Sequence, residues 1–241
     1  MATTTLGNKS VGSIVKLKEN GVLVDFYVAK HDYENGLNGS GRTLVVRKDC
    51  YDTRQWHTSN VNAYATSAID TWLNSTYKNL LDADIRGVIG TTKIKYTPGN
   101  GNTTVGTLER AIFLLSVTEL GRSASYANTE GTALSIASSL QIAYLNGSAV
   151  VQWTRSPRTD GTYGACYLGT NGNVTTAAAA VPTGPVPLSL SPPPSLSAMT
   201  ALCPSTLRPR FLAAMRPAPI WALRPQALIS PIRLRMQTGT Q

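Results

Sequence analysis

Side chains suited to catalysis are scarce in this sequence of 241 residues. His31 and His57 are its only histidines. No Ser-His-Asp arrangement, glycine-rich phosphate loop or paired carboxylates stand out beside them. We interpret His57, which follows Trp56, as a hydrogen-bonded structural histidine. The sequence therefore predicts a protein that is not an enzyme.

The cysteines are scattered, and none has a second Cys or a His at metal-ligand spacing: they are Cys50, Cys166 and Cys203. We expect plain thiols, and we predict no metal and no cofactor. An enzyme remains an alternative. Labelling of Cys50, with loss of function when it is removed, would support that alternative.

A different chemistry, contact through hydrogen bonds and aromatic rings, is offered by residues 150–176. Alternation before Pro157, and again around Asn171-Gly172, predicts two short strands joined by a polar loop. Residues 158–180 contain no Lys, Glu, Gln, Met or Trp, and all can be written with codons that end in a pyrimidine. Random replacement of adenines in Asn-type codons leaves this composition. The alternative is a polar, turn-rich hairpin whose composition arose by chance.

Tyr, Asn, Thr and Gly give contact area and hydrogen bonds at low entropic cost. We expect Tyr163 and Tyr167 to act as aromatic anchors, although either ring could instead be half buried on the sheet. The polar contacts expected beside them are Arg158, Asp160, Thr162, Thr170, Asn171 and Asn173. No Glu-Pro-Asn or Gln-Pro-Asp triplet is present, so we do not expect calcium-dependent sugar binding.

The elements that must position this hairpin come earlier in the chain. Alternating runs at residues 11–18 and 22–29 flank Asn20-Gly21, which predicts a type I′ hairpin. A third antiparallel strand is predicted over residues 43–47. Ser67-Ala68-Ile69-Asp70 has the spacing of a capping box, which predicts a helix over residues 67–77.

The helix over residues 67–77 should bury Trp72 and Leu73. Four further elements are expected between this helix and the hairpin. The first is a second short helix over residues 83–88. Residues 93–96 predict an edge strand, and the apolar run at 111–116 predicts a strand buried on both faces. Small polar residues then predict a surface excursion over residues 122–139. Asn146-Gly147 turns the chain into the strand that carries Trp153.

The composition changes after residue 180, which predicts a domain at 1–180 and a tail at 181–241. The tail holds twelve of the fourteen prolines, six arginines and no acidic residue. One interpretation is a disordered basic tail. The other is a frameshift, because residues 185–193 read one base out of register can decode as Arg-Pro-Ala-Phe-Thr-Leu-Pro-Ser. An undisturbed homologous frame through Val181 would exclude the frameshift.

The net charge of +9 suggests nucleic-acid binding until it is located. The six arginines of the tail leave +3 for residues 1–180, where no basic cluster is interleaved with aromatic residues. Nucleic-acid binding therefore becomes a minor hypothesis. No signal peptide and no membrane-spanning apolar run is evident. We expect synthesis in a bacterial cytoplasm without membrane insertion.

Five motifs in a fixed order carry a family resemblance over roughly residues 12–173. They are Arg47-Lys48-Asp49-Cys50-Tyr51, Arg54-Gln55-Trp56-His57, Ile69-Asp70-Thr71-Trp72-Leu73-Asn74-Ser75-Thr76, Ile112-Phe113-Leu114-Leu115-Ser116-Val117-Thr118-Glu119 and Trp153-Thr154-Arg155-Ser156-Pro157. The chain resembles a family of uncharacterised domains in phage tail-associated and phage-derived bacterial proteins. That family is similar to the C-type-lectin-like variable proteins of diversity-generating retroelements. Gln152 stands where members have a second Trp, and their closing Gly-x-Arg-Pro-Ala strand is missing in this frame.

The resemblance implies an α+β, C-type-lectin-like fold of small antiparallel sheets with two short helices, its final strand missing. It implies that Trp153, Arg155 and Pro157 are structural framework. We also assign Trp72 to the framework, and we expect Arg155 to be held by backbone carbonyls. The implied function is a binding module of a phage or prophage tail, located in the virion tail. It displays a variable loop for host recognition and adhesion.

The expected partners are a host cell-surface protein or glycan and other phage tail proteins, and homo-oligomerisation stays open. The alternative function is a structural tail or baseplate component without direct ligand binding. Exchange of residues 158–176 separates the two, because only a receptor surface would change what is bound.

Overall fold

The computed structural model describes residues 5–181, 184–185 and 189–190, which all belong to one compact unit at residues 1–203. Its strands are β1 Ile14–Glu19, β2 Val22–His31, β3 Thr43–Arg47, β4 Thr53–Arg54, β5 Thr92–Tyr96, β6 Gly106–Arg110, β7 Ile112–Phe113, β8 Ala143–Leu145, β9 Ser148–Val150, β10 Gln152–Pro157, β11 Gly164–Leu168, β12 Val174–Ala178, β13 Gly184–Pro185 and β14 Ser189–Leu190. Its α-helices are α1 Asn35–Asn38, α2 Ala68–Trp72, α3 Lys78–Leu80, α4 Ala83–Val88 and α5 Ala137–Leu140. Two 3₁₀ turns cover Leu6–Asn8 and Tyr64–Thr66.

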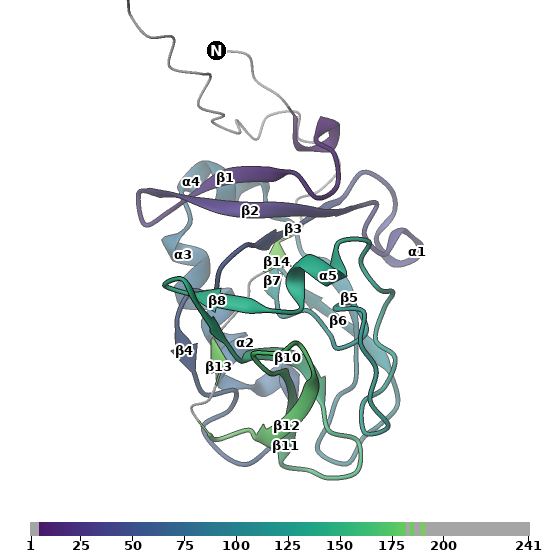
Figure 1. The fold of residues 1–241 in the computed structure, drawn as a ribbon. Helices are drawn as coiled ribbons and strands as arrows, with labels where there is room; N and C mark the ends of the chain where they lie inside the picture. Colours follow the sequence, from purple (N-terminus) through teal and green to yellow (C-terminus); the bar gives the residue numbers. More distant parts are fainter. Residues whose placement is uncertain (1–4, 182–183, 186–188, 191–241) are drawn as a thin grey trace, which may run out of the picture. The chain divides into compact units, whose positions relative to one another are not determined.

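A five-stranded sheet of order β1-β2-β3-β14-β7 lies at one end of this unit, and a three-stranded sheet of order β10-β11-β12 lies at the other (Figure 1). Three two-stranded ladders, β4-β13, β5-β6 and β8-β9, accompany them. Every pairing is antiparallel. The prediction of an α+β fold built from small antiparallel sheets and a few short helices is confirmed at this level.

The β1–β2 hairpin has the predicted type I′ turn, since Asn20 and Gly21 have φ values of 50° and 78°. Val15 and Leu17 on β1 point into the core, whereas Ile14 is 43% exposed. β3 follows with the predicted bounds. Local alternation thus placed these three strands correctly.

Two short strands come from the predicted tail. β13 pairs with β4. Ser189 pairs with both Val46 and Phe113, and Leu190 with both Val45 and Ile112, so β14 joins β3 to β7. Strand pairing therefore continues past the predicted boundary at residue 180, where we expected the final strand to be missing. Of the residues 181–241 that we interpret as a disordered or frameshifted tail, all except 181, 184–185 and 189–190 lie outside the described residues.

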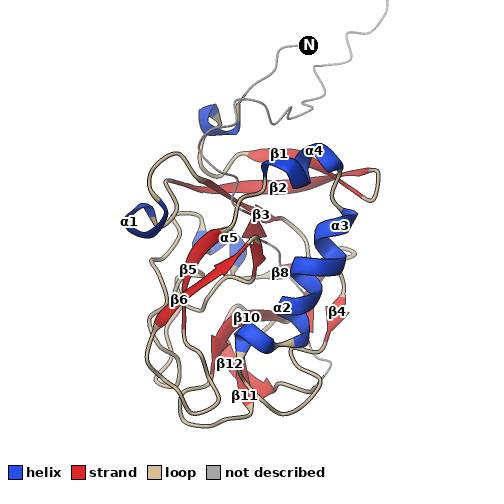
Figure 2. Cartoon of the chain, turned by 180° about the vertical axis from the view of Figure 1, so that it is seen from behind, coloured by secondary structure: helices blue, strands red, loops and turns tan. Residues whose placement is uncertain are grey.

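The helical segment begins where its capping residues predicted. The Ser67 hydroxyl accepts a hydrogen bond from the Asp70 backbone N–H at 3.1 Å. α2 continues through a π-helical turn at Leu73–Tyr77 into α3, and α4 follows along the same side of the unit (Figure 2). Leu73 is fully buried as predicted, but Trp72 is only half buried, and the Arg54 guanidinium covers its ring at 3.7 Å from the ring centroid.

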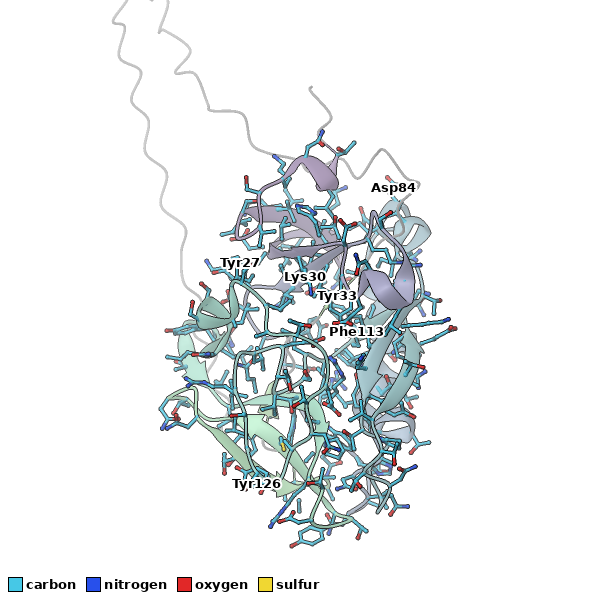
Figure 3. The ribbon with its side chains drawn as sticks, turned by 90° about the vertical axis from the view of Figure 1, so that its right-hand side faces the viewer. Tyr27, Lys30, Tyr33, Asp84, Phe113 and Tyr126 are labelled. Atoms are coloured by element: carbon cyan, nitrogen blue, oxygen red, sulfur yellow. The ribbon has the colours of Figure 1, made fainter. Side chains whose placement is uncertain are left out.

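The core joins the sheets, the helical segment and the loops. The predicted central strand is shorter than expected, because only Ile112–Phe113 pairs, although every residue from 111 to 117 is buried. Phe113 stacks against Tyr33, with ring centroids 5.8 Å apart (Figure 3). The predicted surface excursion at 122–139 is wrong in part, since Glu130 and Leu134 are buried.

The predicted two-stranded hairpin is a three-stranded sheet. β10 and β11 are joined by the polar loop at residues 158–163, and β11 and β12 by the Asn171-Gly172 turn. The turn at Asn146 and Gly147, with φ values of 51° and 80°, leads through β9 into β10 as expected. Apart from Tyr167, which lies on β11, the candidate residues therefore occupy two loops, one at each end of this strand.

Candidate functional site

A buried ion pair supports β10. Arg155 and Glu119 are both 0% exposed, and Arg155 Nη1 lies 2.6 Å from Glu119 Oε2. Arg155 also donates from Nε to the Lys95 carbonyl at 2.9 Å and from Nη1 to the Leu114 carbonyl at 2.8 Å. Burial lowers the pKa of Arg155, but Glu119 and Tyr33 raise it above its usual value. Arg155 is held inside the molecule and is not at the surface.

A second buried carboxylate, Glu130, contacts β10 at Ser156. It accepts hydrogen bonds from the Thr97 backbone N–H at 2.5 Å and from the Ser156 hydroxyl. The Ser116 hydroxyl donates to the Glu130 carbonyl at 2.6 Å. Burial raises the pKa of Glu130. Arg155 and Ser156 of β10 thus bind the loops that carry Glu119 and Glu130, and neither of these loops contains a strand.

Asn62 fixes the backbone of the loop at residues 158–163. Its side chain is fully buried, and Nδ2 lies within hydrogen-bonding distance of the carbonyls of Arg158, Gly161 and Gly164 at 2.9, 3.0 and 2.9 Å. Its backbone N–H donates to the Thr162 carbonyl at 2.9 Å. All of these contacts engage main-chain carbonyls of the loop. The loop conformation therefore depends little on which side chains the loop carries.

The first group of candidate residues lies on this loop and reaches solvent. Tyr163 is 51% exposed, and its ring lies near the Gly161 backbone. Arg158 and Asp160 form an ion pair on the surface, with Nη2–Oδ2 at 2.9 Å. Thr162 is exposed. We call Arg158, Asp160, Thr162 and Tyr163 the first patch.

The second group lies at the far end of β11. Thr170, Asn171 and Asn173 are exposed, and Asn171 Oδ1 accepts the Asn173 backbone N–H at 3.0 Å. A Cβ on Gly172 would lie 3.3 Å from Gln141, so this turn packs beside the α5–β8 connection. The five residues of β11 put about 16 Å between the two groups. Thr170, Asn171 and Asn173 form the second patch.

Tyr167 lies between the patches on β11. It pairs with Trp153 across the strands, and its ring meets the fully buried indole edge-on at 5.7 Å. Tyr167 is half buried, which matches the alternative considered for each tyrosine. Trp153 donates from Nε1 to the Arg54 carbonyl at 3.0 Å, and Pro157 is buried.

Several residues that shape this region were not predicted from the sequence. Asn62 gives no local signal, because its partners lie about 100 residues away. Glu119 is the last residue of one of the five family motifs, so the sequence did carry a signal for it. Tyr126 was also missed: its backbone carbonyl accepts the Thr159 N–H at 2.9 Å, and its ring centroid lies 5.9 Å from the Arg158 guanidinium (Figure 3).

The described cysteines are buried, and the described histidines make hydrogen bonds. Burial raises the pKa of the Cys50 and Cys166 thiols to about 12, and Cys203 lies outside the described residues. His31 uses both ring nitrogens, on the Thr43 hydroxyl at 2.9 Å and the Lys9 carbonyl at 2.8 Å. His57 Nδ1 accepts the Ser59 backbone N–H. No group of three or more His, Cys, Asp or Glu side chains in the described residues could hold a metal ion.

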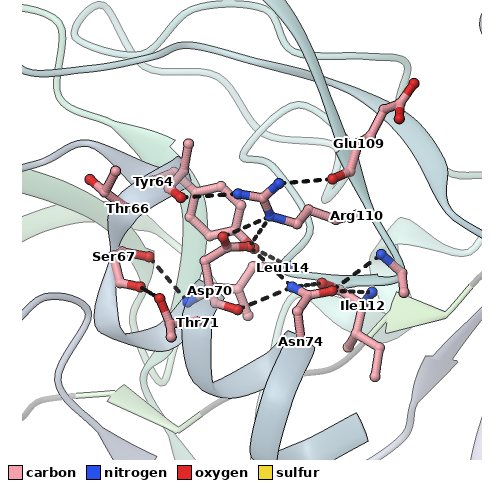
Figure 4. Close-up of polar contacts among 12 residues, drawn as sticks. Tyr64, Thr66, Ser67, Asp70, Thr71, Asn74, Glu109, Arg110, Ile112 and Leu114 are labelled. Carbon is pink, nitrogen blue, oxygen red and sulfur yellow. Dashed lines mark hydrogen bonds and ion pairs between the residues drawn. The ribbon is translucent and has the colours of Figure 1, made fainter.

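An open cleft beside α2 and β6 contains the buried carboxylate of Asp70 (Figure 4). Arg110 Nε lies 2.7 Å from Asp70 Oδ2, and its other nitrogens donate to the carbonyls of Glu109 and Ala65. Asn74 Nδ2 donates to the Ile112 carbonyl at 2.9 Å. The Asp70 carboxylate and the Arg110 guanidinium are thus occupied by the protein itself, so their geometry serves structure. The two exposed patches are the better candidates for contact with a partner.

The chain was compared with known protein families, curated proteins and solved structures. Residues 40–221 match the family described as a domain of unknown function, DUF6273. The chain belongs to this family. No curated protein and no solved structure matches it. The DUF6273 match continues in this frame through Val181 to residue 221, which weighs against the frameshift hypothesis, and resequencing of the coding DNA decides it.

No helix in the described residues of this DUF6273 protein is long and apolar enough to cross a membrane.

Proposed function

We propose that this chain is a non-enzymatic binding module of a phage or prophage tail, with a C-type-lectin-like fold that displays residues 158–176 to a host-surface molecule. The observation that carries the proposal is the separation between backbone and side chains in the loop at residues 158–163. Asn62 holds the loop carbonyls from inside, while Asp160, Thr162 and Tyr163 extend into solvent. Side chains on such a loop can change without loss of the scaffold.

Tyr163 is the residue whose removal tests this function. An exposed aromatic anchor at the centre of an interface contributes about 2 kcal/mol or more, which is about 30-fold in affinity. Tyr144 on β8 provides a matched control, because it is 43% exposed compared with 51% for Tyr163. We expect Tyr163→Ala to weaken binding by about that factor and Tyr144→Ala to leave it unchanged.

The assay applies the fluorescently labelled full chain to a panel of Gram-positive and Gram-negative bacterial cells. A receptor surface is supported if Tyr163→Ala reduces retention and Tyr144→Ala leaves it unchanged. Equal retention of both variants would favour the alternative, a structural tail or baseplate component. The neighbouring DNA gives a second test, since a reverse transcriptase gene and a near-copy of the segment coding for residues 153–173 are expected beside a diversified gene.

A further inference from the structure

A second loop lies against the first patch. Residues 98–104, which we call the Asn100 loop, connect β5 to β6. Asn62 joins the two loops, because its Oδ1 accepts the Asn100 backbone N–H at 2.6 Å while its Nδ2 lies on the carbonyls of the 158–163 loop. A Cβ on Gly101 would lie 3.9 Å from the Thr162 methyl group. The two loops therefore form one continuous surface.

The Asn100 loop is rigid at its base. The backbone of Gly99 approaches Asn62 so closely that a Cβ there would lie 2.0 Å from the Asn62 carbonyl oxygen. Gly99 also exchanges backbone hydrogen bonds with Asn102 at 3.0 and 2.9 Å. Asn128 Nδ2 donates to the Thr103 carbonyl at 2.6 Å. The backbone that carries the exposed Asn100 side chain is thus held in place, which reduces the backbone entropy lost on binding.

The uncharged polar side chains of this surface are free, and its two charged side chains add up to no net charge. Within the described residues, no hydrogen bond engages the side chains of Asn100, Thr162 or Tyr163. Arg158 and Asp160 neutralise each other. The surface therefore offers an amide, two hydroxyl groups and one open aromatic ring to a partner.

We infer that the receptor contact spans the first patch together with Asn100, and that it takes an uncharged, hydroxyl-bearing sugar chain. The inference rests on the proposed function and specifies its ligand. Amide and hydroxyl groups donate to and accept from sugar hydroxyls, and the Tyr163 ring can cover an apolar sugar face. The second patch does not take part, because it lies about 16 Å away beyond β11.

A folded protein surface fits this region less well as the partner. Stable protein interfaces bury about 800 Å² on each side around a core of aromatic and aliphatic anchors. Among the large hydrophobic side chains exposed in the described part of the chain, this surface contains only Tyr163. Val105 comes directly after the Asn100 loop. A polypeptide receptor is therefore the competing outcome of the test.

Asn100→Gly tests the inference without disturbing the backbone. Asn100 has a φ of 49°, which glycine adopts readily, so the substitution removes the amide and keeps the loop. Asn146→Gly is the matched control, since Asn146 is exposed in the β8–β9 turn with a φ of 51°. We expect Asn100→Gly to weaken retention on bound cells about three- to tenfold. Asn146→Gly should retain full binding.

The ligand class is read from the same cells after treatment with periodate, which cleaves vicinal diols, or with proteinase K. Loss of retention after periodate but not after proteinase supports a sugar, and the reverse result overturns the sugar assignment. Retention that depends on Tyr163 but not on Asn100 overturns the joint surface and leaves the proposed function intact. Absence of retention on every cell of the panel overturns both.

Discussion

Single buried side chains decide how the candidate surface is built. Arg155 was expected to be framework from its motif, and its donors do meet carbonyls and a carboxylate inside the molecule. Asn62 could not have been found in the same way. Its amide reaches carbonyls that only the completed fold brings together, so no spacing in the sequence marks it.

Replacement of Glu119 or Glu130 by the neutral residue Gln should lower the free energy of unfolding by different amounts. Glu119→Gln leaves the Arg155 charge without its ionic partner, and we expect a loss of about 3 to 5 kcal/mol in the free energy of unfolding. In Glu130→Gln the amide oxygen can still accept the Thr97 N–H, and the amide N–H can donate to Ser156 Oγ, so we expect a loss of about 1 kcal/mol. Urea unfolding of both variants measures the difference. Equal losses would contradict it.

Asp70 should make stability depend on pH. Burial raises its pKa to about 6, opposed by Arg110, whereas the same carboxyl titrates near 3.8 when unfolded. The folded chain therefore takes up this proton first as the pH falls. From this group alone, the free energy of unfolding rises by about 2 to 3 kcal/mol between pH 7 and pH 4. Asp70→Asn should lack this rise, which chemical denaturation of both proteins at several pH values would show. Parallel pH profiles would contradict the shift.

Among the secondary-structure elements, those with a local pattern were predictable and the others were not. The Asn20-Gly21 turn and the Ser67 cap act on neighbouring residues, so the β1–β2 hairpin and the start of α2 could be predicted. β6 has one aliphatic residue, Leu108, and gives no alternation. β12 consists of small, half-exposed residues, which is why two strands were expected where three are found.

The contact between the Asn100 loop and Asn62 can be tested with a pair of glycines. Gly99 and Gly101 have φ values of 77° and 86°, so alanine is strained at both. Only at Gly99 does a Cβ meet backbone, 2.0 Å from the Asn62 carbonyl oxygen. We expect Gly99→Ala to cost about 3 kcal/mol or more and Gly101→Ala about 1 kcal/mol in thermal unfolding. Similar values would mean that Gly99 is not in tight contact with the Asn62 backbone.

At the scale of the whole molecule, sheet order was beyond reach of the sequence. The family resemblance indicated that a closing strand follows residue 180, but the given frame lacked the expected motif. Nothing in Ser189 or Leu190 identifies β3 and β7 as their partners. Pairing of this kind depends on backbone groups and global packing, which alternation of side chains does not encode.

Truncation measures the importance of β13 and β14. A chain ending at residue 180 lacks both strands and leaves the facing edges of β3 and β7 unpaired, so we expect at least about 2 kcal/mol less stability than the full chain has. A chain ending at residue 203, the limit of the compact unit, should match the full chain. Melting temperatures of the three proteins compare them. Equal stability of all three would show that β14 contributes nothing.

The position of β14 also affects how the protein is made. β3 leaves the ribosome about 140 residues before its neighbour Leu190 does, which at 5 to 20 residues per second is roughly seven to thirty seconds. For that time the nascent chain carries an apolar strand with an open edge, the kind of surface that chaperones shield and that aggregates capture. Slower translation of the last segment should therefore lower the soluble yield.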